Sequence, residues 1–555
     1  MAASTKTRLA AAVAGAATVV LLGGGGLLTA TAAPSRDGAP PPTPTIAWEA
    51  CETTLPGVDV GAYECATVDV PTDYDRPHGR TTQIAVTRLP ATDPERRIGS
   101  VLTNFGGPGG PGVDTLHQVG ELMFAPEVRE RFDVVSFDPR GVGRSDPVTC
   151  FPTAAQEEAF FARLPGFPVT PEEERRTIAG FTVTAAGCQL ISGDRLAHSS
   201  TANVARDMDV LRAALGDKAH TYVGYSYGTI LGATYSALFP DSVRALVLDG
   251  PIDPVAWSGV GSPEPIGVRV RQAHGATQTF GEFTRLCTEV GPGGCALAGL
   301  GDPAELTEEV LQALQDEPVE VPIGGGEPFL VTYQDAVGLL FSGMYNTADW
   351  PAVAATFAEL AVRTGVTDPV PQARQQTPSL DELLRRLGLV EDYPSLGGAV
   401  ASLCMDTHNP LPLWRYPALA DAHDAQYPHF GRLRGWLGAQ CAPILLRDHD
   451  AYTGPWEQSV EQPVLVVGTR FDPATPYEFV EPFAAHYPDA RVLTVEGWGH
   501  TTLGRSTCAD AAIARYLVSG EAQDSATCAQ DLTPFTAGPL AQPLPAPPGP
   551  VRWPF

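Results

Sequence analysis

The chain has 555 residues, a length that predicts more than one domain or one large domain carrying an insertion. Hydrophobic residues make up 43% and charged residues 18%, so a large core can form and global disorder is disfavoured. The formal net charge of −28 argues against a nucleic-acid partner, because contacts to phosphate require positive charge.

The first 32 residues have the features of a secretory signal peptide. A positively charged start is followed by an apolar stretch at residues 9–28, and Ala30-Thr31-Ala32 offers small residues for cleavage before Ala33. A permanent membrane anchor fits less well, because four glycines interrupt the stretch at residues 23–26. No later segment has the ~18 consecutive apolar residues of a membrane helix. We therefore expect a secreted protein without membrane attachment after cleavage.

Ten cysteines follow this signal, and an even number in an exported chain favours disulfides. The simplest scheme joins neighbours along the chain, although sequence alone does not establish the pairing. The pairs in that scheme are Cys51–Cys65, Cys150–Cys188, Cys287–Cys295, Cys404–Cys441 and Cys508–Cys528. Neither C-x-x-C nor H-E-x-x-H spacing occurs, so we predict no metal site.

Short apolar runs ending in Gly- or Pro-bearing loops predict the strands. Two β-like runs come first, and the later runs scarcely alternate, which suits parallel strands covered on both faces. Helical patterns lie between them, for example at residues 201–215, where Thr201 or Asn203 could cap the helix. This alternation predicts a doubly wound, mostly parallel α/β sheet. The predicted strands are residues 63–70, 82–89, 100–105, 132–137, 221–223, 245–248, 464–467 and 492–495.

One gap interrupts this rhythm. Between residues 254 and 456 helical patterns occur, as at 306–314 and 352–362, but no convincing parallel strand. About 200 residues are too many for a loop, so we predict a large, mostly helical insertion above the carboxyl ends of the strands. The predicted segments are a signal peptide (1–32), a Pro-rich leader (33–46), the first part of the core (47–254), the insertion (255–456), the second part of the core (457–532) and a Pro-rich tail (533–555).

The strongest chemical signal is the pentapeptide Gly224-Tyr225-Ser226-Tyr227-Gly228. It follows a predicted strand and precedes a helix-compatible stretch at residues 229–238. A G-x-S-x-G sequence in this context forms the sharp nucleophile turn of α/β hydrolases, which lifts the serine hydroxyl clear of the sheet. The pentapeptide alone occurs by chance, but its position between strand and helix predicts that Ser226 is a catalytic nucleophile.

A serine needs a base, and in this fold the partners follow in the order serine, acid, histidine. Asp472 and His500 follow the last two predicted strands, so both should reach the sheet edge from which Ser226 emerges. We expect Asp472 to orient His500, and His500 to move the proton. Alone, Asp472 could cap a turn and His500 could make a structural hydrogen bond. Asp249, which follows an earlier strand, is the reserve acid.

The oxyanion formed during the reaction needs two amide donors. The amide after the nucleophile, that of Tyr227, is the first. The second should come from the glycine-rich loop at residues 104–112, where Pro108 has no N–H and Gly107 is preferred over Gly106. The same loop contains a G-x-G-x-x-G pattern, but its two prolines remove amides that a dinucleotide would need, so we predict no cofactor. A charged loop at residues 137–146 is expected to hold itself in place rather than to touch substrate.

Several segments together resemble the α/β-hydrolase peptidases that include proline iminopeptidase and the secreted tripeptidyl aminopeptidases of actinomycetes. The matching segments are F-G-G-P-G-G-P-G, F-D-P-R-G-V-G-R-S-D, V-G-Y-S-Y-G-T, L-D-G-P-I-D-P, G-T-R-F-D-P-A-T-P and G-W-G-H. The C-terminal region with Cys441, Cys508 and Cys528 is more similar to the tripeptidyl group than to proline iminopeptidase. Phe105 stands where iminopeptidases have histidine, which weakens that comparison. The resemblance implies exopeptidase action at a free N-terminus.

An aminopeptidase must hold an α-ammonium group, which needs a carboxylate partner in a partly buried cleft. For tripeptide release this carboxylate should lie roughly 10 Å from Ser226, the span of three extended residues. Asp406 in the insertion is a candidate, although an ordinary surface aspartate is the simpler interpretation. We thus expect a secreted serine exopeptidase that removes short peptides, in particular tripeptides, from peptide or protein N-termini. The alternatives are a carboxylesterase with the same triad and a catalytically silent binding protein, and the oligomeric state is left open.

Overall fold

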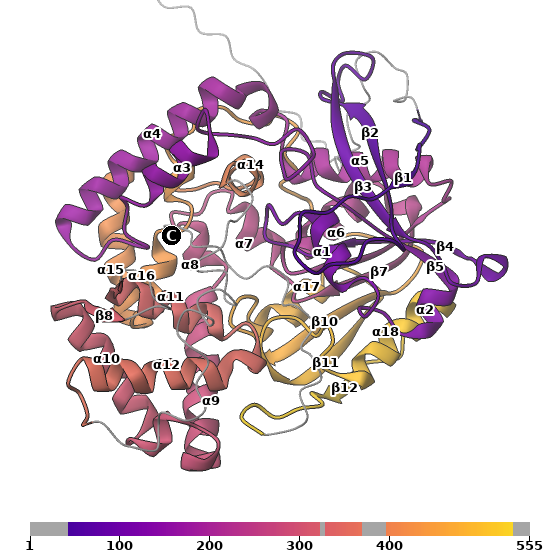
Figure 1. Cartoon of the computed structure of the whole chain (residues 1–555). Helices are drawn as coiled ribbons and strands as arrows, with labels where there is room; N and C mark the ends of the chain where they lie inside the picture. Colours follow the sequence, from indigo (N-terminus) through magenta and orange to yellow (C-terminus); the bar gives the residue numbers. More distant parts are fainter. Residues whose placement is uncertain (1–42, 322–327, 369–395, 537–555) are drawn as a thin grey trace, which may run out of the picture. The chain divides into compact units, whose positions relative to one another are not determined.

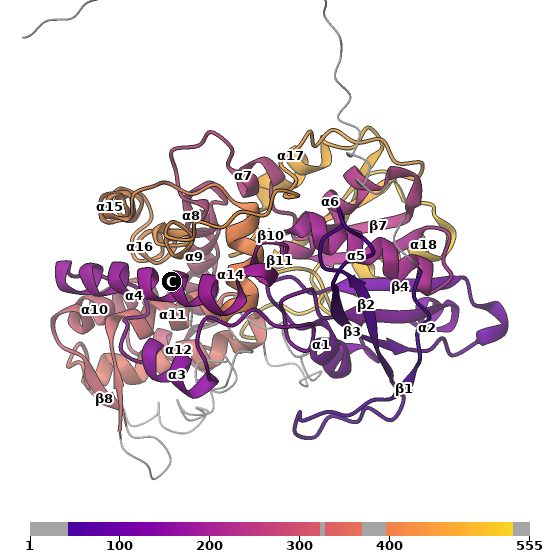
Figure 2. The same ribbon diagram turned by 90° about the horizontal axis from the view of Figure 1, so that it is seen from above.

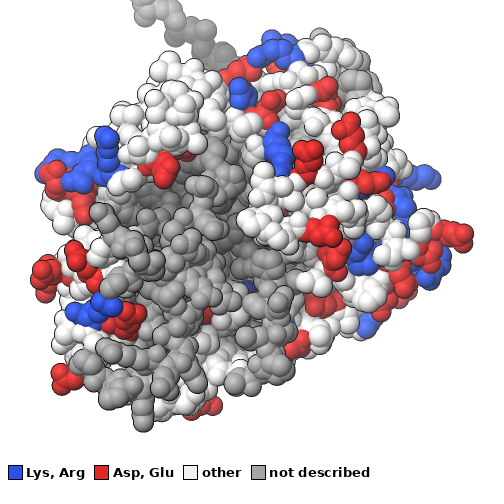
Figure 3. All heavy atoms as spheres, in the orientation of Figure 1, with Lys and Arg blue, Asp and Glu red and all other residues white. Residues whose placement is uncertain are grey.

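The computed structural model describes residues 43–321, 328–368 and 396–536, which all belong to one compact unit. The predicted signal peptide, most of the predicted leader and residues 537–555 of the predicted tail lie outside the described residues. Within the described part of the chain, no helix combines the length and apolar composition needed to cross a bilayer. On the face drawn in Figure 3, basic side chains lie in small groups among acidic ones.

A ten-stranded sheet runs in the order β1-β2-β3-β5-β4-β6-β7-β10-β11-β12 (Figure 1). The neighbours from β1 to β5 pair antiparallel, and all pairs from β5 to β12 are parallel. Every predicted strand is present, whereas β1 and β12 were not predicted, being too short to show a pattern. The strands are β1 (Glu49–Ala50), β2 (Glu64–Pro71), β3 (Thr81–Leu89), β4 (Gly99–Asn104), β5 (Phe132–Phe137), β6 (His220–Tyr225), β7 (Val243–Asp249), β10 (Val464–Phe471), β11 (Ala490–Trp498) and β12 (Ala526–Ala529).

Helices cover both faces of this sheet, because successive side chains of a strand point to opposite sides. In β10, Val464 and Val466 pack into the cluster that contains α5, α6 and α17. Leu465 and Val467 pack into the opposite cluster, with α1, α2 and α18. Burial on both faces explains why the apolar runs do not alternate. These helices are α1 (Gly112–Val119), α2 (Pro126–Arg131), α5 (Thr201–Ala214), α6 (Tyr227–Leu238), α17 (Val480–Ala484) and α18 (Thr507–Ser519).

The predicted cap of α5 was wrong. Ser200 is the N-cap residue, and its own side chain makes no capping hydrogen bond. Instead the Asp448 carboxylate accepts hydrogen bonds from the Ser200 N–H (2.8 Å) and the Asn203 side-chain amide (2.9 Å). A carboxylate distant in sequence therefore replaces the local cap, which no local pattern could indicate.

The chain between β7 and β10 is mostly helical among its described residues. The predicted helices at 306–314 and 352–362 lie within α10 and α12, and a two-stranded antiparallel sheet, β8-β9, was not predicted. Phe283, Trp350 and Phe357 are fully buried in the core of this insertion. Its elements are α7 (Pro254–Ser258), α8 (Ile266–Arg269), α9 (Gln272–Val290), α10 (Pro303–Asp316), β8 (Val319–Val321), β9 (Phe329–Val331), α11 (Tyr333–Gly343), α12 (Trp350–Arg363), α14 (Leu396–Asp406), α15 (Tyr416–Gln426) and α16 (Phe430–Gly435).

A second helical excursion separates β5 from β6, in a stretch that the sequence assigned to the hydrolase core. It consists of α3 (Ala154–Phe161) and α4 (Pro171–Leu196), which lie on the side of α15 and α16 (Figures 1 and 2). Phe181 of α4 packs in one buried cluster with Tyr416 and Trp436 of the insertion. Glu174 of α4 forms an ion pair with Arg432 of α16 at 2.5 Å. These contacts group α4 with the insertion.

Short 3₁₀ helices complete the secondary structure. They are η1 (Pro94–Arg96), η2 (Pro240–Ser242), η3 (Gly291–Gly293), η4 (Leu297–Gly299), η5 (Thr347–Asp349), η6 (Leu413–Arg415), η7 (Ala439–Cys441) and η8 (Tyr477–Phe479). The predicted disulfide scheme is confirmed, since all five neighbour pairs are bonded and no cysteine is free.

Candidate active site

Ser226 occupies the sharp turn between β6 and α6. Its backbone has φ 55° and ψ −123°, a conformation that non-glycine residues rarely adopt outside functional turns. The Ser226 N–H donates to the Asp249 carbonyl at 2.9 Å, and the Thr229 N–H donates to the Ser226 carbonyl at 2.8 Å. A Cβ on Gly224 would lie 2.3 Å from the Gly228 carbonyl oxygen, so this turn requires glycine. The strained turn holds a partly exposed serine at the carboxyl end of β6.

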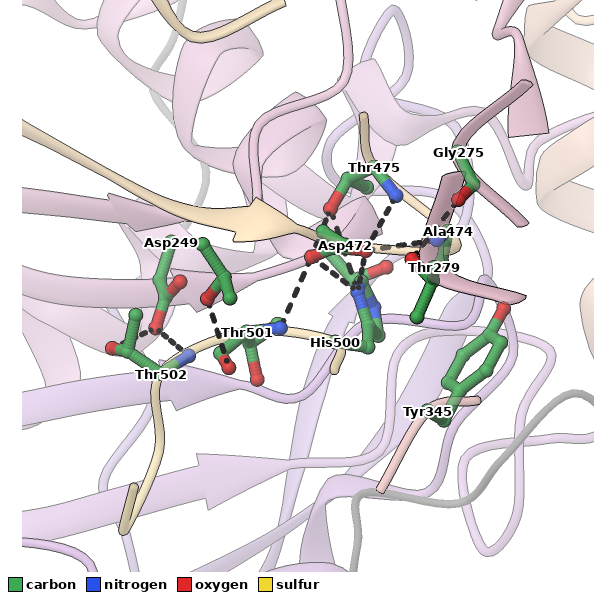
Figure 4. Close-up of polar contacts among 12 residues, drawn as sticks. Asp249, Gly275, Thr279, Tyr345, Asp472, Ala474, Thr475, His500, Thr501 and Thr502 are labelled. Atoms are coloured by element: carbon green, nitrogen blue, oxygen red, sulfur yellow. Dashed lines mark hydrogen bonds and ion pairs between the residues drawn. The ribbon is translucent and has the colours of Figure 1, made fainter. Parts of the chain in front are cut away.

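Asp472 and His500, which follow β10 and β11, are in direct contact. The His500 Nδ1 lies 2.9 Å from both carboxylate oxygens of Asp472 (Figure 4). A carboxylate can only accept, so Nδ1 donates and Nε2 is left for a second partner. The two side chains are buried, with 5% of His500 and 2% of Asp472 exposed. This is the acid–histidine arrangement expected for general base chemistry.

Asp472 is held by more than the imidazole. Its carboxylate accepts the backbone N–H groups of Ala474 and Thr475 at 2.8 Å each, and that of Thr501 at 3.1 Å. Burial alone would raise the pKa of Asp472, but the His500 charge and these hydrogen bonds outweigh burial and hold the pKa below its usual value. Asp472 is therefore an ionised, fixed acceptor that orients the ring.

Asp249, the reserve acid, has a different environment. Its Oδ2 accepts the Thr502 N–H at 2.9 Å and the Thr502 hydroxyl at 2.7 Å (Figure 4). Complete burial raises the pKa of Asp249 to about 6. The hydrogen-bond partner of His500 is Asp472, and Asp249 anchors the segment that follows His500.

Ser226 and His500 share no hydrogen bond within the described residues, but both lie near the Asp249–Gly250 segment. A Cβ on Gly250 would be 3.6 Å from the His500 Cε1, and Gly250 follows Asp249, whose carbonyl holds the Ser226 amide. The structure thus brings Asp472 and His500 together and holds Ser226 on the adjacent turn. Catalytic hydrogen bonds are often long before substrate binds.

The glycine-rich loop rests on the serine turn. A Cβ on Gly106 would lie 2.9 Å from the Ser226 Cβ and 3.2 Å from the Tyr227 amide nitrogen. The Gly106 N–H donates to the Asn104 side chain at 3.0 Å, whereas the Gly107 N–H has no acceptor among the described residues. The Tyr227 amide is in the first turn of α6 and has no acceptor inside that helix. Of the two glycine amides considered, that of Gly107 is the one left for an oxyanion.

Asp406 lies at the end of α14 and is 6% exposed. Its carboxylate accepts the Thr201 N–H (2.8 Å), the Thr201 hydroxyl (2.5 Å) and the Trp257 indole N–H (3.2 Å). The Thr201 hydroxyl also contacts the Tyr227 hydroxyl, so this network supports the helix that follows Ser226. Burial raises the pKa of Asp406 to about 7. The carboxylate already has three donors, and its predicted role as amine ligand stays a prediction.

The charged loop after β5 holds itself in place, as predicted. The Arg140 guanidinium forms two hydrogen bonds to the buried Asp207 carboxylate, at 2.7 and 2.5 Å. Asp138 accepts the N–H groups of Val113 and Arg144. The side chains of Asp138 and Arg140 therefore both bind groups of the protein itself.

The sequence analysis did not predict two residues that lie beside the Asp472–His500 pair. The Thr475 hydroxyl donates to Asp472 at 2.8 Å and lies 3.4 Å from the His500 Nδ1. The Tyr345 ring packs edge-on against the His500 ring, with 4.9 Å between the ring centres. The backbone carbonyl of Tyr345 accepts the backbone N–H of His500 at 2.8 Å. The spacing of Thr475 after Asp472 could have indicated a side-chain contact, whereas Tyr345 belongs to the insertion and has no local signal.

Two groups of potential metal ligands occur among the described residues. In Cys51, Cys65 and His117 the cysteines form a disulfide, which removes the thiolates a metal needs. In the other group, Asp73 already pairs with Arg76 at 2.7 Å, beside His198 and Asp450. Neither group includes a residue of the site described above.

Comparisons with known proteins agree with this geometry. The family model described as "alpha/beta hydrolase fold" matches residues 106–277, and the one described as "TAP-like protein" matches residues 427–528. The serine protease Hip1 of Mycobacterium tuberculosis is 32% identical over 503 residues, covering 86% of this chain and 89% of the relative. The tripeptidyl aminopeptidase of Streptomyces lividans is 28% identical over 501 residues (88% and 87%). Carboxylesterase B of M. tuberculosis is 29% identical over 525 residues (87% and 89%).

Proposed function

Because the chain belongs to the α/β-hydrolase family that contains the serine protease Hip1, we propose that it is a secreted serine exopeptidase that removes short peptides, in particular tripeptides, from free N-termini. The observation that carries this proposal is the buried Asp472–His500 pair beside the strained turn of Ser226. The tripeptidyl specificity rests on the 28% identical aminopeptidase, and export rests on five disulfides.

In the proposed reaction, the Ser226 hydroxyl attacks the scissile carbonyl carbon while the His500 Nε2 takes its proton. Asp472 keeps the imidazole in the required tautomer and stabilises its positive charge. The amides of Gly107 and Tyr227 donate to the oxyanion. His500 then protonates the leaving amine, and water hydrolyses the acyl-enzyme by the same steps in reverse order. The peptide's α-ammonium group is expected in the insertion, with Asp406 as the candidate partner.

A carboxylesterase is the second candidate, because the same groups cleave esters and a relative of similar identity is named carboxylesterase B. Peptides with free and acetylated N-termini, compared with short acyl esters, separate the two functions. Mass spectrometry of the products from an unblocked peptide ladder identifies the bond that is cut. If acetylation leaves peptide turnover unchanged, the aminopeptidase proposal is wrong.

The nucleophile is tested by Ser226→Ala. We expect a loss of about 10⁶-fold in kcat and no labelling by a fluorophosphonate probe, because the acyl-enzyme would form on the Ser226 oxygen. Ser242→Ala is the matched control, since Ser242 is also partly exposed but lies at the opposite end of β7. Labelling that persists in Ser226→Ala would show that another residue is the nucleophile.

A further inference from the structure

Arg434 of α16 is a buried guanidinium without a counter-ion. It is 6% exposed, and within the described residues no carboxylate lies at ion-pair distance from it. One of its terminal nitrogens donates to the Gln272 side-chain oxygen, and its Nε has no acceptor. The Phe341 ring lies 5.1 Å from the guanidinium carbon.

Other buried arginines of this protein are compensated. Arg140 and Arg432 each pair with a carboxylate at 2.5 Å. Arg269 donates to the carbonyl oxygens of Glu264, Trp257, Ala256 and His408. An uncompensated buried charge destabilises a fold, so its presence needs an explanation.

The uncompensated charge of Arg434 shifts the pKa of a neighbouring residue. Burial, followed by the Arg434 charge, lowers the pKa of the neighbouring His423 to about 4, and the His423 Nε2 also lacks a partner. Burial lowers the pKa of Arg434 itself to about 10, which leaves it protonated at neutral pH. The region therefore presents a positive charge that nothing in the described chain neutralises.

Phe341 and Gln272, which contact Arg434, lie in segments that also contact the proposed catalytic pair. The Phe341 ring packs against the Tyr345 ring at 5.6 Å, and the Tyr345 ring packs against His500 at 4.9 Å. Gln272 begins α9, and a Cβ on Gly275 in the first turn of that helix would lie 2.6 Å from the Asp472 carbonyl oxygen. Figure 4 shows Tyr345 and Gly275 on the same side of the Asp472–His500 pair. Tyr345, which contacts both Phe341 and His500, is partly exposed.

We propose that Arg434 binds a carboxylate of the substrate close to the scissile bond. A guanidinium offers two parallel N–H donors that match a carboxylate, and such a pair is strong where water is excluded. The carboxylate would come from a Glu or Asp side chain, or from the C-terminus of a short peptide. This inference rests on the proposed function and makes the enzyme selective for acidic peptides.

The experiment uses peptide pairs that differ only by Glu or Gln at each position flanking the cleaved bond. A second set of pairs ends in a free carboxylate or an amide. For the full-length wild type we expect kcat/KM to be at least about 30-fold higher for the acidic member at one position, the usual lower range for a buried charge pair. The responding set identifies the source of the carboxylate.

Three variants assign the effect to this side chain. In Arg434→Met the ratio should fall to about 1, and in Arg434→Lys, which keeps the charge but loses the two-pronged donor, it should be intermediate. Arg271→Gln is the control, because Arg271 precedes Gln272 but is exposed and pairs with Glu478, and its ratio should equal that of the wild type. Thermal unfolding and fluorophosphonate labelling of each variant report folding and the nucleophile separately.

A wild-type ratio near 1 at every position, or a high ratio that Arg434→Met retains, would overturn the role of Arg434. In both cases peptide cleavage and Ser226 labelling would still support the proposed function. Absence of labelling and of peptide cleavage in the wild type would instead remove the proposed function, and with it this inference.

Discussion

Asp249 is the last residue of β7, and Asp472 directly follows the neighbouring strand β10. Both are buried, but their surroundings shift their pKa values in opposite directions. Asp472 faces the His500 ring and three backbone N–H groups, which lower its pKa despite burial. Asp249 has one residue, Thr502, as donor to its carboxylate, and burial raises its pKa to about 6. Asp472 is the carboxylate that contacts the imidazole, and its lowered pKa keeps it ionised to stabilise a histidine cation.

This difference predicts unequal effects of two similar substitutions. Asp472→Asn should lower kcat by about 10⁴-fold, because the amide favours the wrong imidazole tautomer. Asp249→Asn should lower kcat less than about 10-fold, since it changes only the anchor of Thr502. Steady-state kinetics with an unblocked peptide, together with thermal unfolding, measure both. Equal losses of kcat in stably folded variants would contradict the assignment of the acid.

Among the elements, α4 shows how a disulfide joins a helix to a distant segment. Cys188 of α4 is bonded to Cys150, which follows the charged loop after β5, and the bond spans 38 residues. The Cys287–Cys295 bond, by contrast, spans 8 residues. A cross-link restricts the unfolded chain more when the closed loop is longer.

Removing each bond by a double Cys→Ala substitution should therefore destabilise the protein unequally. The chain-entropy relation gives a loss of about 4 kcal/mol for Cys150–Cys188 and about 2.5 kcal/mol for Cys287–Cys295. Urea unfolding of the two variants and the wild type under non-reducing conditions measures the difference. A larger loss for the shorter loop would show that native packing around the bond, and not loop closure, dominates.

The protein as a whole buries carboxyl groups whose protons are lost near neutral pH. Burial raises the pKa of Asp406 to about 7, and burial followed by the Asp249 charge raises that of Asp510 to about 7. The ordinary value is 3.8, so between these limits the folded state holds protons that the unfolded state has released. This contribution to stability is present at low pH and is lost as the pH rises through about 7.

We therefore expect Asp406 and Asp510 to make the free energy of unfolding fall between about pH 6 and pH 8. A single group with a pKa of about 7 contributes about 1.4 kcal/mol to this fall. Asp406→Asn should reduce the fall by that amount, and Asp241→Asn, which changes an exposed carboxylate, should leave it unchanged. Chemical unfolding at several pH values tests both. A pH dependence that is the same in Asp406→Asn and the wild type would contradict the raised pKa.

Much of this architecture could be predicted because it is encoded in short stretches of chain. A strand buried on both faces needs an unbroken apolar run. The turn of Ser226 needs glycine at position 224, because a Cβ there would collide with the backbone of Gly228. Ser226, Asp472 and His500 each follow a predicted parallel strand. Because the carboxyl ends of parallel strands lie at the same edge of a sheet, their common location could be predicted. The disulfide pairs match the simplest scheme, which joins neighbours along the chain.

The partners of individual polar side chains could not be predicted, because they depend on segments that meet only after folding. The donor set of Asp406, the cap of α5 and the contact between Tyr345 and His500 each join residues far apart in the chain. The same holds for the association of α4 with the insertion and for the missing counter-ion of Arg434. Local sequence determines which elements form, whereas the burial and charge of a side chain depend on what the packed elements place around it.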